Sequence, residues 1–243
     1  MEKVVVIGAS GGIGHSVAKL LLDKGFFVLG TYYKNPQRLE DLTSNFKSKY
    51  LDLQNTKSIA SFFKEIDGEV FAVVNCQGIV EIEGKTLEKD FEIWNKTIAT
   101  NLTANYYLGK ISKGKISPNG RFIMISSTDS FFGGAVTASY AASKAGVNSL
   151  TKSLSLEFAD KKIRVNSIAP GWVETAMTED NGEEFLKKIA QMNPLKRNGQ
   201  PIDVAYLVEF LLSNKSEYIN GQVITLDGGY TNQDPTLLIE ESL

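Results

Sequence analysis

The sequence has little of what disulfides, metal sites or membrane segments require. Its 243 residues include one cysteine, Cys76, and one histidine. A single cysteine excludes an intrachain disulfide and indicates a reducing compartment, so a cytoplasmic protein is expected. One histidine and one cysteine cannot build a His/Cys zinc site, and no metal is expected.

The charge balance and the apolar runs argue against two further classes of protein. The 26 basic and 28 acidic residues give a net charge of −2, which implies no general attraction to nucleic acid. No apolar run has membrane length, and the first residues lead directly into a strand-like segment instead of a signal segment. We expect a single large α/β domain over residues 1–243 that binds neither nucleic acid nor membrane.

Strand-like and helix-like segments alternate along the chain. Residues 4–7 form a β-branched run that is typical of a buried parallel strand, and an apolar stripe predicts a helix after it. Further strands are predicted at 26–31, 49–51, 70–75, 121–126, 163–169 and 222–226, and further helices at 35–45, from 58, at 88–111, 138–159, 183–192 and 202–212. This order predicts a doubly wound parallel sheet of about seven strands with helices on both faces.

A glycine-rich turn follows the first predicted strand, where residues 8–14 read Gly-Ala-Ser-Gly-Gly-Ile-Gly. Glycines let the backbone approach a pyrophosphate closely, and the N-terminus of the next helix offers free N–H groups to its charge. Strand, glycine-rich turn and helix are therefore the context of a dinucleotide site. A tight turn without a ligand would look similar, so the interpretation depends on the residues downstream.

A hydroxyl, a phenol and an amine have a spacing that suits redox chemistry between carbonyls and alcohols. Ser127 follows a predicted strand, and Tyr140 and Lys144 are four residues apart, so they share one helix face. An ammonium near a phenol should lower the phenol's pKa below its usual ~10, which suits a general acid/base. Ser127 would polarise the substrate oxygen. Alone, Tyr-x-x-x-Lys also occurs as an ordinary surface pair.

Together, these segments resemble the short-chain dehydrogenase/reductase family from about residue 4 to residue 230, and within it the 3-oxoacyl-acyl carrier protein reductases most. The resemblance implies a Rossmann-type fold and hydride transfer between a nicotinamide cofactor and a carbonyl or secondary alcohol, with Tyr140 as general acid/base. The catalytic residues implied are Asn101, Ser127, Tyr140 and Lys144. The implied cofactor contacts are Gly8, Ser10, Gly12, Ile13, Gly14, Tyr32, Lys34, Asp52, Asn75, Gly78, Tyr140, Lys144, Pro170, Gly171 and Thr175.

Several of these roles are specific to one residue. By resemblance, Lys144 bonds the ribose hydroxyls, Asn101 holds a water, and Asp52 bonds the adenine amine, although Asp52 would also serve as a cap for the helix near Asn55. The chain departs from the family pattern at residues 76–77, where Cys-Gln replaces Asn-Ala. That departure affects local packing more than activity.

The residues after the second predicted strand favour NADP(H) over NAD(H). NAD-dependent relatives commonly carry an acidic residue there for the ribose 2′-hydroxyl, whereas residues 31–35 read Thr-Tyr-Tyr-Lys-Asn. Lys34 would attract a 2′-phosphate, unless it is an ordinary solvated turn lysine. Gly11 stands where NADP-preferring relatives often have Arg or Lys, so NAD(H) stays open.

The substrate is less well defined than the reaction. The pocket is expected to include Thr128, Asp129, Phe131, Phe132, Trp172 and Met177, with residues 179–195 closing over it as a lid. The basic residues 110, 113 and 115 would suit an acidic carrier protein, but cations at a helix C-terminus explain them better. Pro118 replaces the basic residue usual in carrier-protein reductases. A sugar, a polyol or a small ketone therefore remains open.

Two expectations concern alternatives and assembly. A catalytically idle NADP-binding regulatory protein would be expected to lack one of the four catalytic residues, and all four are present. A homo-oligomer, tetramer more than dimer, is expected because helices 88–111 and 138–159 carry extra apolar residues, namely Tyr106, Tyr107, Leu108, Val147, Leu150 and Leu154. The tail 231–243, with Leu237, Leu238 and Ile239, is expected to dock on a neighbouring subunit.

Overall fold

Seven strands form one parallel sheet in the order β3-β2-β1-β4-β5-β6-β7. The computed structural model describes residues 1–42, 44–179 and 181–233. The strands are β1 (Lys3–Ile7), β2 (Phe27–Tyr32), β3 (Phe46–Tyr50), β4 (Val70–Asn75), β5 (Ile116–Ile125), β6 (Arg164–Pro170) and β7 (Val223–Leu226). This is the predicted doubly wound α/β fold in a single domain.

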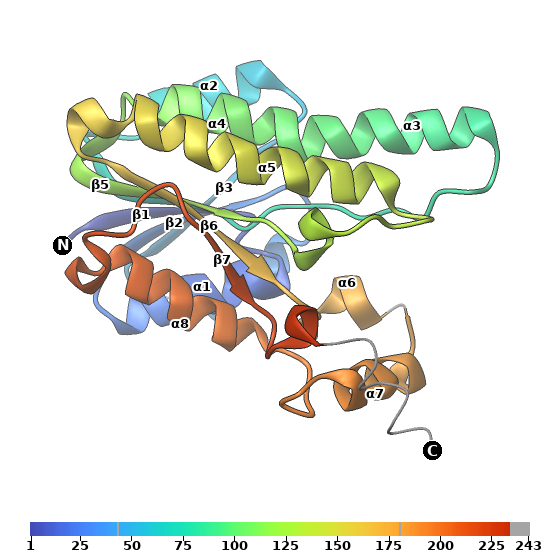
Figure 1. The fold of residues 1–243 in the computed structure, drawn as a ribbon. Coiled ribbons are helices and arrows are strands. Elements are labelled where there is room, and N and C mark those ends of the chain that lie inside the picture. The colour runs from blue at the N-terminus through green and yellow to red at the C-terminus, as the bar shows by residue number, and fades with distance from the viewer. Residues whose placement is uncertain (43, 180, 234–243) are drawn as a thin grey trace.

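Helices cover both faces of the sheet (Figure 1). One layer contains α2 (Thr56–Lys64), α3 (Leu87–Ile98), α4 (Ala104–Ser112) and α5 (Ala138–Glu157), and the other contains α1 (Gly12–Asp23) and α8 (Pro201–Leu212). Two further helices, α6 (Ala176–Glu179) and α7 (Glu183–Met192), lie beyond the ends of β6 and β7. No helix among the described residues is long and apolar enough to cross a bilayer.

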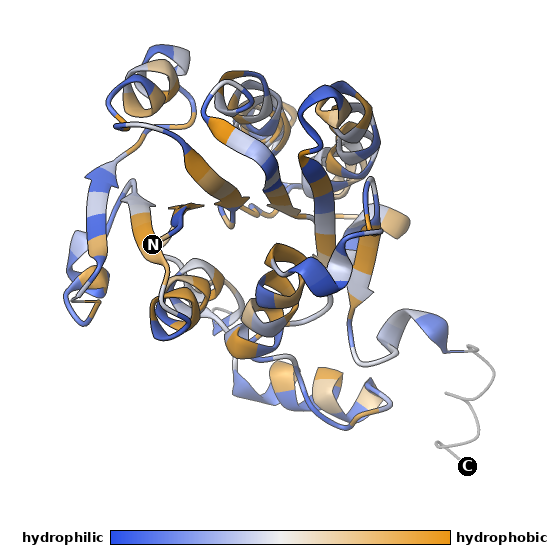
Figure 2. Ribbon diagram, turned by 90° about the vertical axis from the view of Figure 1, so that its left-hand side faces the viewer, coloured by the Kyte–Doolittle hydropathy of each residue, from blue (hydrophilic) through white to orange (hydrophobic). Residues whose placement is uncertain are grey.

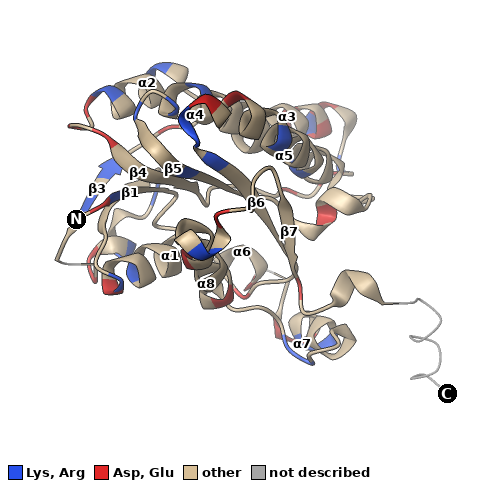
Figure 3. Cartoon of the chain, turned by 60° about the vertical axis from the view of Figure 1, so that its left-hand side comes forward, with Lys and Arg blue, Asp and Glu red and all other residues tan. Residues whose placement is uncertain are grey.

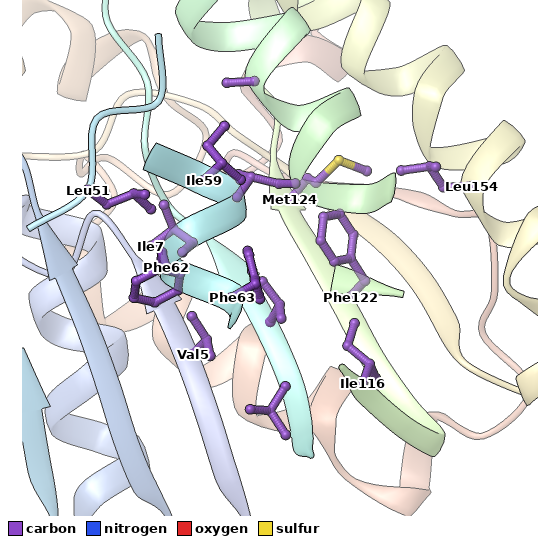
Figure 4. Close-up of a cluster of buried hydrophobic side chains, with 14 of the residues drawn as sticks. Val5, Ile7, Leu51, Ile59, Phe62, Phe63, Ile116, Phe122, Met124 and Leu154 are labelled. Carbon is purple, nitrogen blue, oxygen red and sulfur yellow. The ribbon is translucent and has the colours of Figure 1, made fainter. Parts of the chain in front are cut away.

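The strand β1 shows why both faces must be covered. Alternate side chains of a strand point to opposite faces, and Val5 and Ile7 join a core cluster that contains Phe63 and Phe122 (Figure 4). Val4 and Val6 join a second cluster on the other face, with residues of α1 and α8. Strands β1 and β4 are accordingly mostly hydrophobic, whereas β5 and β6 also contain hydrophilic residues, and the flanking helices mix both kinds (Figure 2). The acidic and basic residues are interspersed over those helices (Figure 3).

Several predicted elements differ from the structure, among them strand β5, which begins at Ile116 instead of 121. The helix expected at 35–45 is one 3-10 turn, Pro36–Leu39, because few apolar residues there reach the core. The strand β3 begins at Phe46 instead of 49; its lysines stay in water at the sheet edge, so the segment lacks an apolar run. The single helix expected at 88–111 is interrupted by a π-helical turn at Ala99–Thr103.

The surface expected for assembly is smaller than the sequence suggested. Leu108, Val147 and Leu154 are buried in the core of the chain itself, where they pack between their helices and the sheet. Tyr106 and Tyr107 are exposed, as expected. Of the tail, residues 231–233 are described, and Leu237, Leu238 and Ile239 lie outside the described residues.

Candidate active site

The carboxyl ends of the central strands meet at one edge of the sheet. Ile7 of β1 is level with Asn75 of β4, which is level with Met124 of β5. The segments that follow these strands therefore converge, together with the turn after β6, around one cavity of about 460 Å³. Among the predicted residues, those that line the cavity are Ile13, Gly78, Ser127, Thr128, Asp129, Tyr140, Lys144, Pro170, Gly171, Trp172, Thr175 and Met177.

The glycine-rich loop has the geometry that a dinucleotide requires. Gly8 has a φ of +76°, and a Cβ on Gly14 would lie 2.2 Å from the carbonyl oxygen of Gly8. A Cβ on Gly12 would lie 2.8 Å from Cγ2 of Thr175 across the cavity mouth. Helix α1 begins at Gly12 with no side-chain cap and no acidic residue in its first turn. Its N–H groups and positive dipole end therefore suit a pyrophosphate, so these residues fit a nicotinamide dinucleotide.

The end of β2 gathers the residues expected at the adenosine end of the cofactor. The Ser10 hydroxyl donates to the carbonyl oxygen of Lys34 at 3.1 Å. The ring of Tyr32 lies edge-on to the ring of Tyr50, with centroids 6.2 Å apart. Within the described chain the Lys34 ammonium makes no ion pair and lies 6.0 Å from the centroid of Tyr33. The structure thus brings Ser10, Tyr32 and Lys34 together.

Asp52, at the end of β3, does not cap the next helix. Its Oδ1 accepts from the backbone N–H of Gln54 at 2.9 Å. The cap of α2 is Asn55, whose Oδ1 accepts from the N–H groups of Lys57 and Ser58. The alternative role considered for Asp52 is therefore wrong, and its contact with adenine stays a prediction.

Asn101 lies in the π-helical turn and is completely buried. Its Oδ1 accepts from the N–H of Ile79 at 2.9 Å, and its Nδ2 donates to the carbonyl of Ile79 at 2.8 Å and to the Ser143 hydroxyl at 3.2 Å. One amide thus fixes the loop after β4 against helix α5. Gly78 in this loop lies close to the amine, since a Cβ there would lie 3.2 Å from Nζ of Lys144.

A second asparagine, Asn105, continues this network and was not singled out from the sequence. Its Nδ2 donates to the main-chain carbonyl of Asn101 at 2.6 Å, and its Oδ1 accepts from Nδ2 of Asn75 at 2.8 Å. Asn75 in turn accepts the N–H of Gln77 at 3.1 Å. A signal was present in the sequence: two asparagines four residues apart on a predicted buried helix need partners.

Lys144 and Tyr140 lie on helix α5 at the cavity wall. The Lys144 ammonium donates to the carbonyl of Ile125 at 2.8 Å and lies 5.6 Å from the centroid of the Tyr140 ring. Burial lowers the pKa of Lys144 to about 8. Burial also raises the pKa of Tyr140 to about 12, although the hydrogen bond with Ser127 lowers it. Desolvation disfavours the charged form of each group.

The expectation that Lys144 brings the pKa of Tyr140 toward neutrality is therefore wrong for this structure. The largest effect on the phenol is burial, which opposes the phenolate, and the nearby carboxylate of Asp129 raises the pKa further. Sequence spacing places the ammonium on the right helix face, but it does not reveal how strongly the pocket desolvates both groups. At neutral pH Tyr140 keeps its proton.

The substrate side of the cavity differs from the expected pocket at two positions. Thr128, Trp172 and Met177 line it, whereas Phe131 and Phe132 do not. The 3-10 turn Thr128–Phe131 carries the chain away from the cavity, and both phenylalanines are about half exposed. Further lining residues were not predicted from the sequence, because loop paths are not encoded in a periodic pattern; among them are Gln77, Val80, Glu81, Ile82, Thr137 and Thr178.

The expected lid, residues 179–195, contributes only Asn181 to the cavity lining among its described residues, and position 180 lies outside them. Helix α7 of this segment packs on the cavity wall through Phe185, whose ring lies 5.3 Å from that of Trp172, centroid to centroid. Closure over a substrate stays a prediction.

Known proteins resemble this chain in sequence and in structure. A family model described as Enoyl-(Acyl carrier protein) reductase matches residues 8–231. The chain is 37% identical to a 3-oxoacyl-[acyl-carrier-protein] reductase of Vibrio cholerae and 35% identical to one of Rickettsia conorii, each over 93% of this chain and 95% of the relative. A short-chain type dehydrogenase/reductase from Mycobacterium ulcerans matches with a TM-score of 0.87 and 28% identity, over 99% of this chain and 94% of that chain.

The chain belongs to the short-chain dehydrogenase/reductase family. This short-chain dehydrogenase/reductase is thus an NAD(P)-dependent oxidoreductase that acts on C=O or CH–OH groups, as the resemblance noted from the sequence implied. Its cavity contains the hydroxyl, phenol and amine that such a reaction needs.

Cys76 allows a direct test of how strongly the cavity wall desolvates its groups. Burial raises the pKa of its thiol to about 12. Since the thiolate is the reactive form, modification by a disulfide reagent at pH 8 should be roughly 10³-fold slower in the folded protein than in the urea-unfolded chain. The rate should also keep rising tenfold per pH unit up to pH 9.5. A plateau below pH 9 in the folded protein would contradict the raised pKa.

Proposed function

We propose that this protein reduces a ketone or aldehyde with NADPH in the cytoplasm, and that Tyr140 is the general acid. One observation carries the proposal: the phenol of Tyr140 lines the same cavity as the Ser127 hydroxyl and the Lys144 ammonium, and that ammonium lies 5.6 Å from the centroid of the Tyr140 ring. The single free thiol, Cys76, supports the reducing compartment.

Different residues of the chain would bind the cofactor, orient the carbonyl group and donate the proton in a carbonyl reduction. A bound nicotinamide would supply the hydride. The loop from Gly8 to Gly14 would hold its pyrophosphate, and Thr175 and the turn at Pro170 would face its reactive ring. Ser127 would hold the carbonyl oxygen, and Tyr140 would give its proton to that oxygen as negative charge develops. A phenol with a pKa of about 12 is protonated at neutral pH, which favours the reductive direction.

Charge at the end of β2 supports NADP(H) over NAD(H). Residues 31–35 contain no carboxylate that would repel a 2′-phosphate. The Lys34 ammonium has no ion pair among the described residues, and the Ser10 hydroxyl bonds the main-chain carbonyl of the same lysine. A phosphate dianion would gain an ion pair and hydrogen bonds at this place.

The contacts of the basic residues argue for a free small molecule over a carrier-bound substrate, although the relatives are named for acyl carrier protein. Lys110 pairs with Glu157 at 2.6 Å, and Lys113 pairs with Asp160 at 2.9 Å. Lys115 donates to the carbonyl of Ile66 at 2.8 Å. These lysines precede β5, so they lie at the sheet edge opposite the cavity. They are engaged within the chain and far from the reacting groups.

A homo-oligomer, tetramer more than dimer, is the assembly that we infer. Three large apolar side chains on neighbouring helices remain exposed: Tyr106 and Tyr107 of α4 and Leu156 of α5. Helices α4 and α5 lie side by side on one face of the molecule (Figure 1). A second copy related by two-fold symmetry would cover the same side chains on both subunits.

Replacing Tyr140 by Phe keeps the ring and removes the transferable proton. NADPH should still bind, while turnover on a reducible carbonyl falls by about 10²–10⁴-fold, as expected for loss of a general acid. Absorbance at 340 nm measures turnover, and cofactor fluorescence measures binding. The matched control is Tyr206→Phe on the exposed surface of α8, which should change neither. Near-normal turnover of Tyr140→Phe would refute the mechanism.

Tyr32→Asp should reverse the cofactor preference. The new carboxylate repels a 2′-phosphate and accepts from a 2′-hydroxyl, so the ratio of NADH to NADPH affinity should rise at least about tenfold, equivalent to ~1.4 kcal/mol. Titration calorimetry measures both dissociation constants. Tyr32→Asn, which has a similar shape and no charge, should change the ratio much less. Wild-type protein that binds NADH more tightly than NADPH would overturn the assignment.

Light scattering tests the assembly. The wild-type protein at micromolar concentration should have the mass of a tetramer or dimer, and Tyr107→Glu should shift it toward smaller species, because a buried unpaired carboxylate is costly. Tyr206→Glu, on the other face of the sheet, is the control and should leave the mass unchanged. A wild-type monomer at micromolar concentration is the result that would exclude the proposal.

A further inference from the structure

One charged side chain at the cavity has no role in the mechanism. Asp129 follows Ser127 by two residues and lines the same cavity. Its backbone is fixed: the N–H donates to the Ser127 hydroxyl at 3.2 Å, and the carbonyl accepts from Phe132 at 3.3 Å. The carboxylate itself has no hydrogen-bond donor or ion pair among the described residues.

The surroundings leave this carboxylate poorly compensated. Burial raises the pKa of Asp129, and the only charge that lowers it is Lys144. The Lys144 ammonium already donates to the carbonyl of Ile125. The other carboxylate at the cavity, Glu81, pairs with Lys96. A carboxylate only accepts hydrogen bonds, and leaving it partly desolvated without a donor is unfavourable.

No neighbouring side chain engages the Asp129 carboxylate among the described residues. The cavity wall mixes apolar residues such as Val80 and Ile82 with polar ones, and the Thr178 hydroxyl donates to the carbonyls of Val173 and Thr175. A molecule that enters the cavity therefore meets this carboxylate as a free hydrogen-bond acceptor beside Ser127.

We propose that Asp129 determines substrate specificity by accepting a hydrogen bond from a hydroxyl or ammonium group close to the reacting carbonyl carbon. The inference rests on the proposed carbonyl reductase function and names its substrate class: hydroxylated or amino-substituted ketones and aldehydes, together with the corresponding polyols or amino alcohols. A 3-oxoacyl thioester has no such donor beside its keto group. Substrates with a carboxylate or phosphate at this place would be repelled.

Matched pairs of probes test the proposal. The pair 1-hydroxy-2-butanone and 3-pentanone differs by a hydroxyl in place of a methyl group, and 1-amino-2-butanone supplies an ammonium. The wild-type protein should favour the donor-bearing probes in kcat/KM by about 10- to 100-fold. Asp129→Leu should abolish the preference, which is a ratio of two kcat/KM values and does not depend on a common change in rate through Tyr140. Asp129→Asn should lower the preference partly. Asp23→Leu, on the surface of α1, should leave it unchanged.

The outcomes separate the specificity proposal from the proposed function. A preference equal in the wild-type protein and Asp129→Leu would overturn the role of Asp129 while leaving carbonyl reduction intact. If no probe is reduced, the reductase function fails for this class. Equilibrium binding of 1,2-butanediol against 3-pentanol, followed by protein NMR, then decides the role of Asp129. Tighter binding of the diol that is lost in Asp129→Leu supports it, and equal binding excludes it. If kcat/KM for the hydroxyl probe and the ammonium probe differs by more than tenfold, the probe with the higher value identifies the donor that Asp129 binds.

Discussion

The parallel register of β1, β4, β5 and β6 is the constraint on which the whole active site depends. Alternate residues of these strands are buried on opposite faces, so a shift by one residue would turn the side chains of Val4 and Val6 toward the wrong helices. The same register sets where each strand ends. Met124 lies level with Asn75, and Ile125 with Ile168, so the residues beyond them meet at one edge. Core packing thereby determines the position of groups such as Ser127, which contribute little to the core.

Helix α5 and the π-helical turn place the functional side chains at that edge: Tyr140 and Lys144 lie on α5, and Asn101 lies in the turn. Asn101 bonds both main-chain groups of Ile79, and the interruption of the helix leaves its own carbonyl to Asn105. The loop after β4 is therefore rigid where it faces Lys144. The burial of the groups beside this loop has an electrostatic consequence, since desolvation disfavours the charged form of each. The phenol of Tyr140 stays neutral and the amine of Lys144 becomes a weaker base.

Local patterns in the sequence predict the order of strands and helices and the spacing of the site residues. They do not predict the π-helical turn, the direction of Phe131 or the pKa of Tyr140. The glycine-rich turn, the order of strands and the spacing of Tyr140 and Lys144 are local, and each predicts its element well. The π-helical turn is not visible, because the apolar spacing from α3 to α4 hardly changes across an inserted residue. The outward direction of Phe131 depends on a 3-10 turn, and the raised pKa of Tyr140 depends on burial by distant segments. The π-helical turn, the direction of Phe131 and the pKa of Tyr140 all depend on contacts between segments that are distant in the sequence.

The paths of the loops around the cavity do not depend on the side chains that would contact a substrate. Gln77 and Asp129 both face the cavity, and each is held through its backbone N–H, by the side chains of Asn75 and Ser127 respectively. A backbone bond does not depend on the side chain of the residue that donates it. The loops can therefore keep their paths while these two side chains change, and only the contacts with a ligand are altered. The carboxylate at position 129 makes no hydrogen bond or ion pair with the described residues, and we explain it by the molecule that the cavity accepts.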